Sequence, residues 1–199
     1  MERVRLAWSV GGRSFEAIEP DRELVLEHAA KLVGWYNAPA NASMMDSSGR
    51  MSHADVVDFW RELRNSGGRG FLGFMSGELV GDADVRGMRD GAGEFAIMIG
   101  AQAQQGRGLG RALASMIHVF AFRELGLERL FVPPRIDNWR VHALNRFLGY
   151  GRDDSLAARA YADGPKSETY SISASTFRAL HSDAWNGVVA ELFAGAGAR

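Results

Sequence analysis

A glycine-rich run between a strand-like stretch and a helix-like stretch constrains the fold of this chain most. It comprises residues 105–110, QGRGLG, and comes after the strand-like residues 94–99, EFAIMI. A loop with so little side chain before a helix turns backbone N–H groups toward one point, where the helix dipole favours negative charge. We therefore predict that a phosphorylated group binds there. The residues that would hold it are Gln105, Gly106, Arg107, Gly108, Leu109, Gly110 and Arg111.

Two common phosphate-binding motifs do not fit this run. The Walker pattern ends in Gly-Lys-Ser/Thr, but Arg111 and Ala112 follow the last glycine here. The dinucleotide pattern G-x-G-x-x-G requires a third glycine where Leu113 stands. What remains is Q-x-x-G-x-G, from Gln105 to Gly110. Arg107 within this pattern and Arg111 directly after it either add positive charge for the phosphates or are solvated arginines.

The remaining pattern resembles the pyrophosphate loop of the GNAT superfamily, the Gcn5-related N-acetyltransferases, which transfer an acyl group from acyl-coenzyme A to an amine. Before the loop, residues 71–75 and 79–85 are similar to the central hairpin of that family. After the loop, residues 138–150 resemble its late segment, N-x-x-A-x-x-x-Y-x-x-x-G-F. The asparagine, the glycine and the closing aromatic residue align. Val141 replaces a residue that is usually small, and Asn145 replaces the usual tyrosine.

The resemblance implies an α+β fold in which a mixed, mostly antiparallel central sheet is flanked by helices. We expect an N-acyltransferase domain over residues 1–175 and a C-terminal helical extension over residues 176–199. Hydrophobic periodicity and turn residues predict further elements. These are strands at 3–10, 14–18, 128–132 and 170–173, helices at 21–36 and 52–64, a helix from Asn138, and a terminal helix at 176–193.

Composition excludes several other functions. The 199 residues carry a net charge of −1, which gives no basic field for nucleic acid. No apolar stretch reaches the roughly 20 residues that span a bilayer, so we expect a cytoplasmic protein with no membrane partner. The chain has no cysteine, so it forms no acyl-cysteine intermediate and no thiolate metal site. The histidine spacing also predicts no metal site. Because the chain has no cysteine nucleophile, direct attack of an amine on the thioester in a ternary complex is favoured.

Glu94 is the predicted catalytic base. An alkylammonium group has a pKa near 10.4 and must lose a proton before its nitrogen attacks a carbonyl. Glu94 stands fourteen residues before Gly108, at a position that resembles the catalytic glutamate of the family's histone acetyltransferases. The alternative, a carboxylate that only holds the sheet, carries equal weight, since perturbed carboxylates are often structural.

The resemblance also assigns residues along the coenzyme arm. Met98, Ile99 and Gly100 would offer backbone groups to the thioester carbonyl and the pantetheine amides. Asn138 would contact the arm, or would only cap a helix. Asn145 stands where a tyrosine usually protonates the leaving thiolate, and an amide only hydrogen-bonds. His142, one turn earlier, is an alternative acid or a structural histidine.

The acceptor pocket is expected in the helix and loop before the central hairpin. Trp35 and Tyr36 belong to a W-x-N element similar to that of ribosomal-protein and aminoglycoside acetyltransferases. They would line the pocket, or would simply belong to the core. The same two alternatives apply to Met44, Met45, Phe59 and Trp60.

Together these residues predict an N-acetyltransferase that uses acetyl-CoA as its acyl donor and needs no metal. The acceptor is a primary amine, either a small molecule or a protein N-terminus, and a homodimer is left open. The alternative is a non-catalytic acyl-CoA-binding module, which Asn145 keeps open. A hydrolase using Ser43, Ser47 or Ser48 lacks the G-x-S-x-G elbow.

Overall fold

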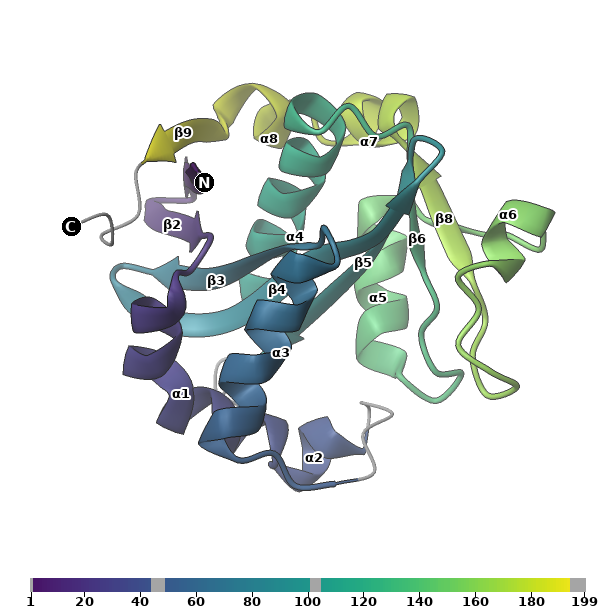
Figure 1. The fold of residues 1–199 in the computed structure, drawn as a ribbon. Coiled ribbons are helices and arrows are strands. Elements are labelled where there is room, and N and C mark those ends of the chain that lie inside the picture. Colours follow the sequence, from purple (N-terminus) through teal and green to yellow (C-terminus); the bar gives the residue numbers. More distant parts are fainter. Residues whose placement is uncertain (1, 44–48, 101–104, 194–199) are drawn as a thin grey trace.

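The computed structural model describes residues 2–43, 49–100 and 105–193, which form a central sheet covered by helices (Figure 1). The strand order is β7-β8-β6-β5-β4-β3-β2-β1-β9. The strands are β1 (Arg3–Val10), β2 (Arg13–Ile18), β3 (Arg69–Met75), β4 (Glu78–Arg89), β5 (Ala92–Ile99), β6 (Arg129–Val132), β7 (Gly151–Arg152), β8 (Tyr170–Ser173) and β9 (Val189–Phe193). Among these described strands, β5 and β6 form the parallel pair and the other neighbours are antiparallel. The expected mixed, mostly antiparallel sheet is confirmed.

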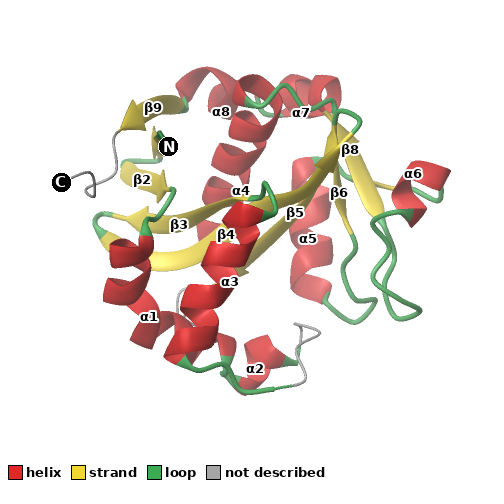
Figure 2. Ribbon diagram, viewed as in Figure 1, coloured by secondary structure: helices red, strands yellow, loops and turns green. Residues whose placement is uncertain are grey.

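Helices lie on both faces of the sheet (Figure 2). They are α1 (Arg22–Tyr36), α2 (Pro39–Ala42), α3 (His53–Asn65), α4 (Leu109–Val119), a π-helical turn η2 (Phe120–Glu124), α5 (Trp139–Leu148), α6 (Leu156–Arg159), α7 (Ala174–Leu180) and α8 (Ser182–Gly187). Helices α1 and α3 cover one face, and α4 covers the other (Figure 1). In the parts of the chain that are described, no helix is both long and apolar enough to cross a membrane.

Side-chain caps form at the start of both helices before the central hairpin. The Asp21 carboxylate accepts a hydrogen bond from the Leu24 N–H at 2.9 Å and starts α1. At α3, Ser52 and Asp55 form the reciprocal pair of a capping box. These caps fix where each helix begins and therefore which face it turns toward the sheet.

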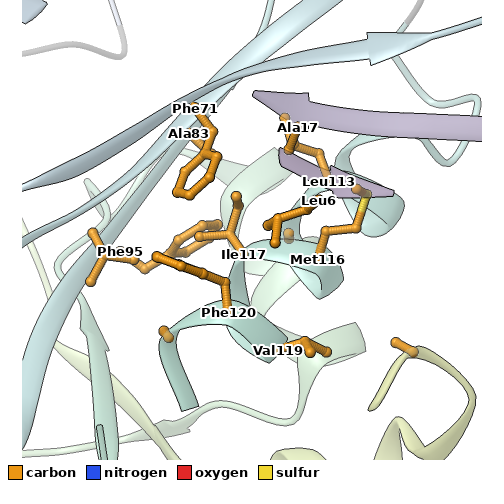
Figure 3. Packing of buried hydrophobic residues seen from close by; sticks show 14 of the residues in the cluster. Leu6, Ala17, Phe71, Ala83, Phe95, Leu113, Met116, Ile117, Val119 and Phe120 are labelled. Carbon is orange, nitrogen blue, oxygen red and sulfur yellow. The ribbon is translucent and has the colours of Figure 1, made fainter. Parts of the chain in front are cut away.

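Helix α4 occupies the centre of the larger core. Its apolar side chains pack against one face of the sheet, as Figure 3 shows for Leu113, Met116 and Ile117 near Leu6 and Phe71. All the apolar side chains of this helix, from Leu109 to Val119, are buried. A helix this enclosed has little freedom to shift, so the loop that precedes it is held at a fixed place against β5.

The predicted terminal helix at 176–193 is wrong as a single element. The chain instead forms α7, α8 and the strand β9, which pairs with β1 from Arg3↔Phe193 to Ala7↔Val189. The break lies at His181, whose backbone leaves the helical region at φ −125° and ψ 47°. The His181 imidazole Nε2 bonds the Leu148 carbonyl at 3.1 Å. That tertiary contact favours a turn that local propensity does not reveal.

Candidate functional site

A cleft opens where the parallel strands β5 and β6 separate. They pair over only three positions, from Ala92↔Arg129 to Glu94↔Phe131. Strand β6 then ends at Val132, and two prolines that cannot donate hydrogen bonds follow it. Strand β5 continues to Ile99, so its β6-facing edge has no strand partner there among the described residues. Backbone donors and acceptors are therefore available along this edge.

A cavity of about 630 Å³ lies in this cleft, a size typical of small-molecule sites. It brings together Met98, Ile99, Gln105, Gly106, Gly108, Gly110, Arg111 and Asn138 from the sequence prediction. Ala40, Asn41, Ile97 and residues of α5 also line it, and the sequence did not identify these. Glu94, Gly100, Arg107, Leu109, Asn145, Trp35 and Tyr36 are not among the lining residues.

The glycine loop has the backbone of an anion site. Gly106 and Gly108 adopt positive φ values of 78° and 82°, and Gly108 is the N-cap of α4. No side chain caps this helix within the described chain, so its first N–H groups have no side-chain acceptor. These donors face the cavity from the positive end of an eleven-residue helix.

Gln105 ties the loop to the end of β5. Its Nε2 donates to the Ile99 carbonyl at 2.8 Å, while its buried Oε1 has no hydrogen-bond partner in the described residues. Asn41 connects the end of α1 to the residue after β5, because its Nδ2 donates to the Trp35 carbonyl at 3.0 Å and to the Gly100 carbonyl at 3.2 Å. Asn41 was missed because nothing in the local sequence distinguishes it from a loop asparagine.

Hydrogen-bond alternation decides which β5 groups face the cleft. The Gly100 N–H donates to the Val80 carbonyl on β4 at 3.0 Å. In an antiparallel ladder, bonded positions recur every second residue, so the backbone groups of Met98 also turn toward β4. Those of Ile97 and Ile99 turn toward the cleft, consistent with the bond from Gln105 to Ile99. Of the three residues predicted to offer backbone groups, Ile99 faces the cleft, and Ile97 is an addition.

A smaller cavity of about 390 Å³ adjoins the loop and contains three arginines. Arg13, the first residue of β2, donates to the Arg107 carbonyl at 3.2 Å. The Arg111 guanidinium lies 4.6 Å from the centre of the Phe147 ring, and both residues line the cavity. Arg13 is 94 residues away in sequence, so only the folded sheet reveals that it belongs to the site.

Glu94 is held by an arginine. Its Oε1 accepts hydrogen bonds from Arg86 Nε at 3.0 Å and from the terminal nitrogen of Arg86 at 2.6 Å. Arg86 is its cross-strand partner on β4. Glu94 lies at the last paired position of β5 and β6, before the point where the cleft opens.

The α5 residues divide between cap and core. Asn138 caps the helix, accepting from the Val141 N–H at 3.3 Å, and it also lines the cavity. Asn145 is buried, and its Nδ2 has no hydrogen-bond partner in the described chain. His142 bonds the Arg135 carbonyl through Nε2 at 3.1 Å, which matches the structural alternative for this histidine.

Trp35 and Tyr36 are buried in a second core between α1, α3 and the sheet. A β-carbon on Gly100 would lie 1.8 Å from Trp35 Cδ2, so the close contact of this indole with β5 requires glycine. The Tyr36 hydroxyl donates to the Asp82 carboxylate at 3.1 Å. Phe59 and Trp60 belong to the same core, whereas Met44, Met45, Ser47 and Ser48 lie outside the described residues.

Solved structures with this fold include three acetyltransferases. RimJ from Mycobacterium smegmatis, in complex with CoA-disulfide, superposes with a TM-score of 0.71 at 15% identity over 88% of this chain and 91% of that one. A putative ribosomal-protein-serine acetyltransferase from Vibrio cholerae gives 0.63 at 20%, over 84% and 97%. Aminoglycoside acetyltransferase AAC(6')-Ib in complex with coenzyme A gives 0.65 at 17%, over 88% and 98%. These likenesses show the fold.

The family is shown by the sequence. No curated protein matches the chain. The family model described as Acetyltransferase (GNAT) domain matches residues 18–150, which run from the end of β2 through the glycine loop to the end of α5. Because this match covers more than half of the residues, the chain belongs to the GNAT acetyltransferase family.

Proposed function

We propose that this protein transfers an acetyl group from acetyl-CoA to a primary amine by direct attack in a ternary complex. The observation that carries the proposal is the single cavity that joins the uncapped N-terminus of α4 to the unpaired edge of β5. One end of such a cavity suits a pyrophosphate, and the edge of the strand suits an extended chain that contains amides. Bound acetyl-CoA supplies the activated acetyl group.

The residues of the cavity fit this donor. The N–H groups at the start of α4, with Gly106 and Gly108 around them, would hold the pyrophosphate. The backbone of Ile97 and Ile99 would bond the pantetheine amides, with Gln105 and Asn138 beside the arm. The unpartnered Oε1 of Gln105 is an acceptor that a ligand N–H would satisfy.

Asn145 is proposed to stabilise the leaving sulfur. Its buried Nδ2 is a donor that lacks a partner among the described residues. An amide donates a hydrogen bond to a thiolate but does not supply a proton at neutral pH, so the sulfur would take its proton from another source.

The acceptor is proposed to be a small-molecule amine or a protein N-terminus. Structures with this fold include the ribosomal-protein-serine and aminoglycoside acetyltransferases above and a chimera of spermidine N-acetyltransferase SpeG from Vibrio cholerae. The acceptors in their names range from spermidine through aminoglycosides to a ribosomal-protein serine. Glu94 is proposed as the base that takes a proton from the amine. Its carboxylate would do so while paired with the Arg86 guanidinium.

The test is amine-dependent release of free thiol from acetyl-CoA. Purified protein is incubated with acetyl-CoA and a panel of polyamines, aminoglycosides, amino acids and N-terminal peptides. Release that depends on both the protein and an amine is the expected result. Coenzyme binding with no release above the background for any amine would favour the alternative, a non-catalytic acyl-CoA-binding module.

The cavity beside the loop yields a prediction about salt. Arg13→Ala should weaken CoA binding by up to about fivefold at low salt, because an exposed cation near a phosphate contributes up to about 1 kcal/mol. The loss should shrink as ionic strength rises, since added salt screens the same interaction. Titration calorimetry at two salt concentrations measures this. The matched control is Arg61→Ala on α3, where Arg61 pairs with Asp58 away from the cavity. Equal losses in both variants would contradict a phosphate role for Arg13.

A further inference from the structure

The smaller cavity, of about 390 Å³, meets the larger one at the first turn of α4. We call the larger one the donor cavity and the smaller one the hairpin cavity, because the β1–β2 hairpin forms one of its walls. The two cavities share Gly108 and Arg111. A ligand whose pyrophosphate bonds the N–H groups at the start of α4 would therefore extend from one cavity into the other. The hairpin cavity is large enough to hold part of a ligand, since small-molecule sites begin at roughly 300 Å³.

The hairpin cavity carries an excess of positive charge. Arg13, Arg107 and Arg111 line it, and no acidic residue does so in the described chain. Among the described residues, none of these three guanidinium groups forms an ion pair with a carboxylate. A concave site lined by one sign of charge attracts ions of the other sign, so this cavity favours an anion.

Two of these arginines are held by contacts that leave hydrogen-bond donors for a ligand. Arg13 donates through Nη1 to the Arg107 carbonyl at 3.2 Å, which uses one of the five N–H groups of its guanidinium. The Arg111 guanidinium lies over the Phe147 ring, 4.6 Å from its centre. Such a stacked contact uses the flat face of the guanidinium and not its N–H edge. Both side chains can therefore offer N–H groups to a phosphate, the anion whose geometry suits them.

Aromatic rings give the hairpin cavity a second, independent feature. Trp8 and Phe147 both line it, and both are partly buried. The Trp8 indole packs against the end of α8, since a β-carbon on Gly187 would lie 2.8 Å from its Nε1. This contact holds the indole in place. Nucleobases stack on aromatic side chains and on arginine, so the rings and cations together suit a base that carries a phosphate.

The hairpin wall of this cavity lies outside the part of the chain by which the family is recognised. Its residues there are Trp8, Val10, Gly11, Arg13 and Phe15. All of them precede residue 18, where the match to the family begins. Trp8 and Arg13 also do not line the donor cavity. What these two residues bind is therefore a property of this chain, and it is distinct from the pyrophosphate at the glycine loop.

We propose that the hairpin cavity binds the 3′-phosphorylated adenosine of the acyl donor, with Arg13 at the 3′-phosphate and the Trp8 ring beside the adenine. The proposal rests on the proposed use of acetyl-CoA and specifies which form of the donor the protein selects. Beyond its pyrophosphate, CoA carries a ribose with a 3′-phosphate and an adenine, the two groups that this cavity suits. Arg107 adds charge at the 3′-phosphate. Arg111, which lines both cavities, lies between the pyrophosphate and the adenosine.

Titration calorimetry at low salt with CoA and 3′-dephospho-CoA tests the phosphate contact. The wild type should bind CoA about tenfold more tightly, because each of two exposed cations near a phosphate contributes up to about fivefold. Arg13→Ala should weaken CoA binding by up to about fivefold and leave 3′-dephospho-CoA binding unchanged. Arg13→Lys keeps the charge and should recover most of the loss. The matched control is Arg146→Ala, an exposed arginine of α5 that lines neither cavity, and it should bind both ligands as the wild type does.

A third ligand, 4′-phosphopantetheine, lacks the adenosine and tests the contact with the base. Trp8→Ala should weaken the binding of CoA and of 3′-dephospho-CoA alike, by about fivefold or more, because a base loses its stacking partner. The same variant should bind 4′-phosphopantetheine as the wild type does, which would also show that it is folded. Phe147→Leu gives the same comparison from α5 if Trp8→Ala does not fold.

Adenosine 3′,5′-bisphosphate distinguishes the donor from a separate nucleotide as the occupant of the cavity. It should compete with CoA for the wild type, and binding alongside CoA without competition would overturn the proposal. Equal wild-type affinity for CoA and 3′-dephospho-CoA, or an equal loss of both in Arg13→Ala, would also overturn it. These measurements need no acetyl transfer. A protein that prefers CoA but releases no thiol with any amine contradicts the proposed function alone, whereas thiol release with no preference for the 3′-phosphate contradicts this subsite alone.

Discussion

Gly108→Val is expected to weaken CoA binding by at least about 10²-fold. Gly108 has φ 82°, a region that β-branched residues essentially do not adopt, so valine should turn the loop and its N–H groups away from the cavity. Losing two hydrogen bonds to a charged group, worth about 1.5–3 kcal/mol each, gives this magnitude. A β-carbon at Gly108 would meet no described protein atom within 4 Å, so the defect comes from backbone conformation and from the space left for a ligand.

The matched control is Gly126→Val. Gly126 also has a positive φ, 69°, and a β-carbon there would meet nothing described within 4 Å, yet it lies outside the cavity. The two variants should lose similar thermal stability, but only Gly108→Val should lose CoA affinity in titration calorimetry. Unchanged affinity in a folded Gly108→Val protein would place the phosphate site elsewhere.

His118→Ala is expected to cause a large loss of stability. The imidazole is fully buried, stacks on Phe177 and contacts the edge of Phe95. Its Nδ1–H donates to the Ala114 carbonyl at 2.7 Å, so Nε2 is left to accept from the Tyr150 hydroxyl at 2.8 Å. Truncation leaves a cavity and an unpaired hydroxyl, together about 3 kcal/mol or more. The melting temperature should fall by about 10 °C, measured by scanning calorimetry. A fall of only a degree or two would contradict this packing.

The same histidine gives a pH dependence with a definite sign. Burial lowers the pKa of His118 from its usual 6.5 to about 3, so the folded protein holds the imidazole neutral. Below pH 6.5 the unfolded chain takes up a proton that the folded chain does not, so acid favours unfolding. Comparison with His118→Phe isolates this effect, because Asp82 and Asp84 titrate in both proteins. Between pH 7.5 and 5, the wild type should lose about 2 kcal/mol relative to that variant. Parallel stability curves would show that His118 is protonated in the fold.

The sequence predicted most of the elements that build the site, because their signals are local. The glycine loop, the start of α3 at Ser52 and the apolar face of α4 each depend on residues within a few positions of one another. Arg13 and Asn41 were missed because their roles arise from contacts across 94 and 59 residues of chain. Such contacts require the sheet order, which residue patterns did not supply.

The carboxylates show the same division between local and tertiary information. Spacing from the loop selected Glu94, but spacing does not reveal that Arg86 lies opposite and binds it. A usable signal was nevertheless present in residues 79–85, where Asp82 and Asp84 interrupt an otherwise apolar strand. Two acidic residues on one face of the otherwise apolar segment 79–85 indicate buried carboxylates, which the structure shows at both positions.

The most direct test of the account is to find where the acetyl group goes. The protein is incubated with acetyl-CoA that carries an isotopic label in its acetyl group and with the amine that gives the fastest thiol release. The products are then separated and identified by mass spectrometry. We expect the label to appear as an amide on the nitrogen of that amine, in an amount equal to the thiol released. Recovery of the label as free acetate, or its retention on intact acetyl-CoA, would contradict it.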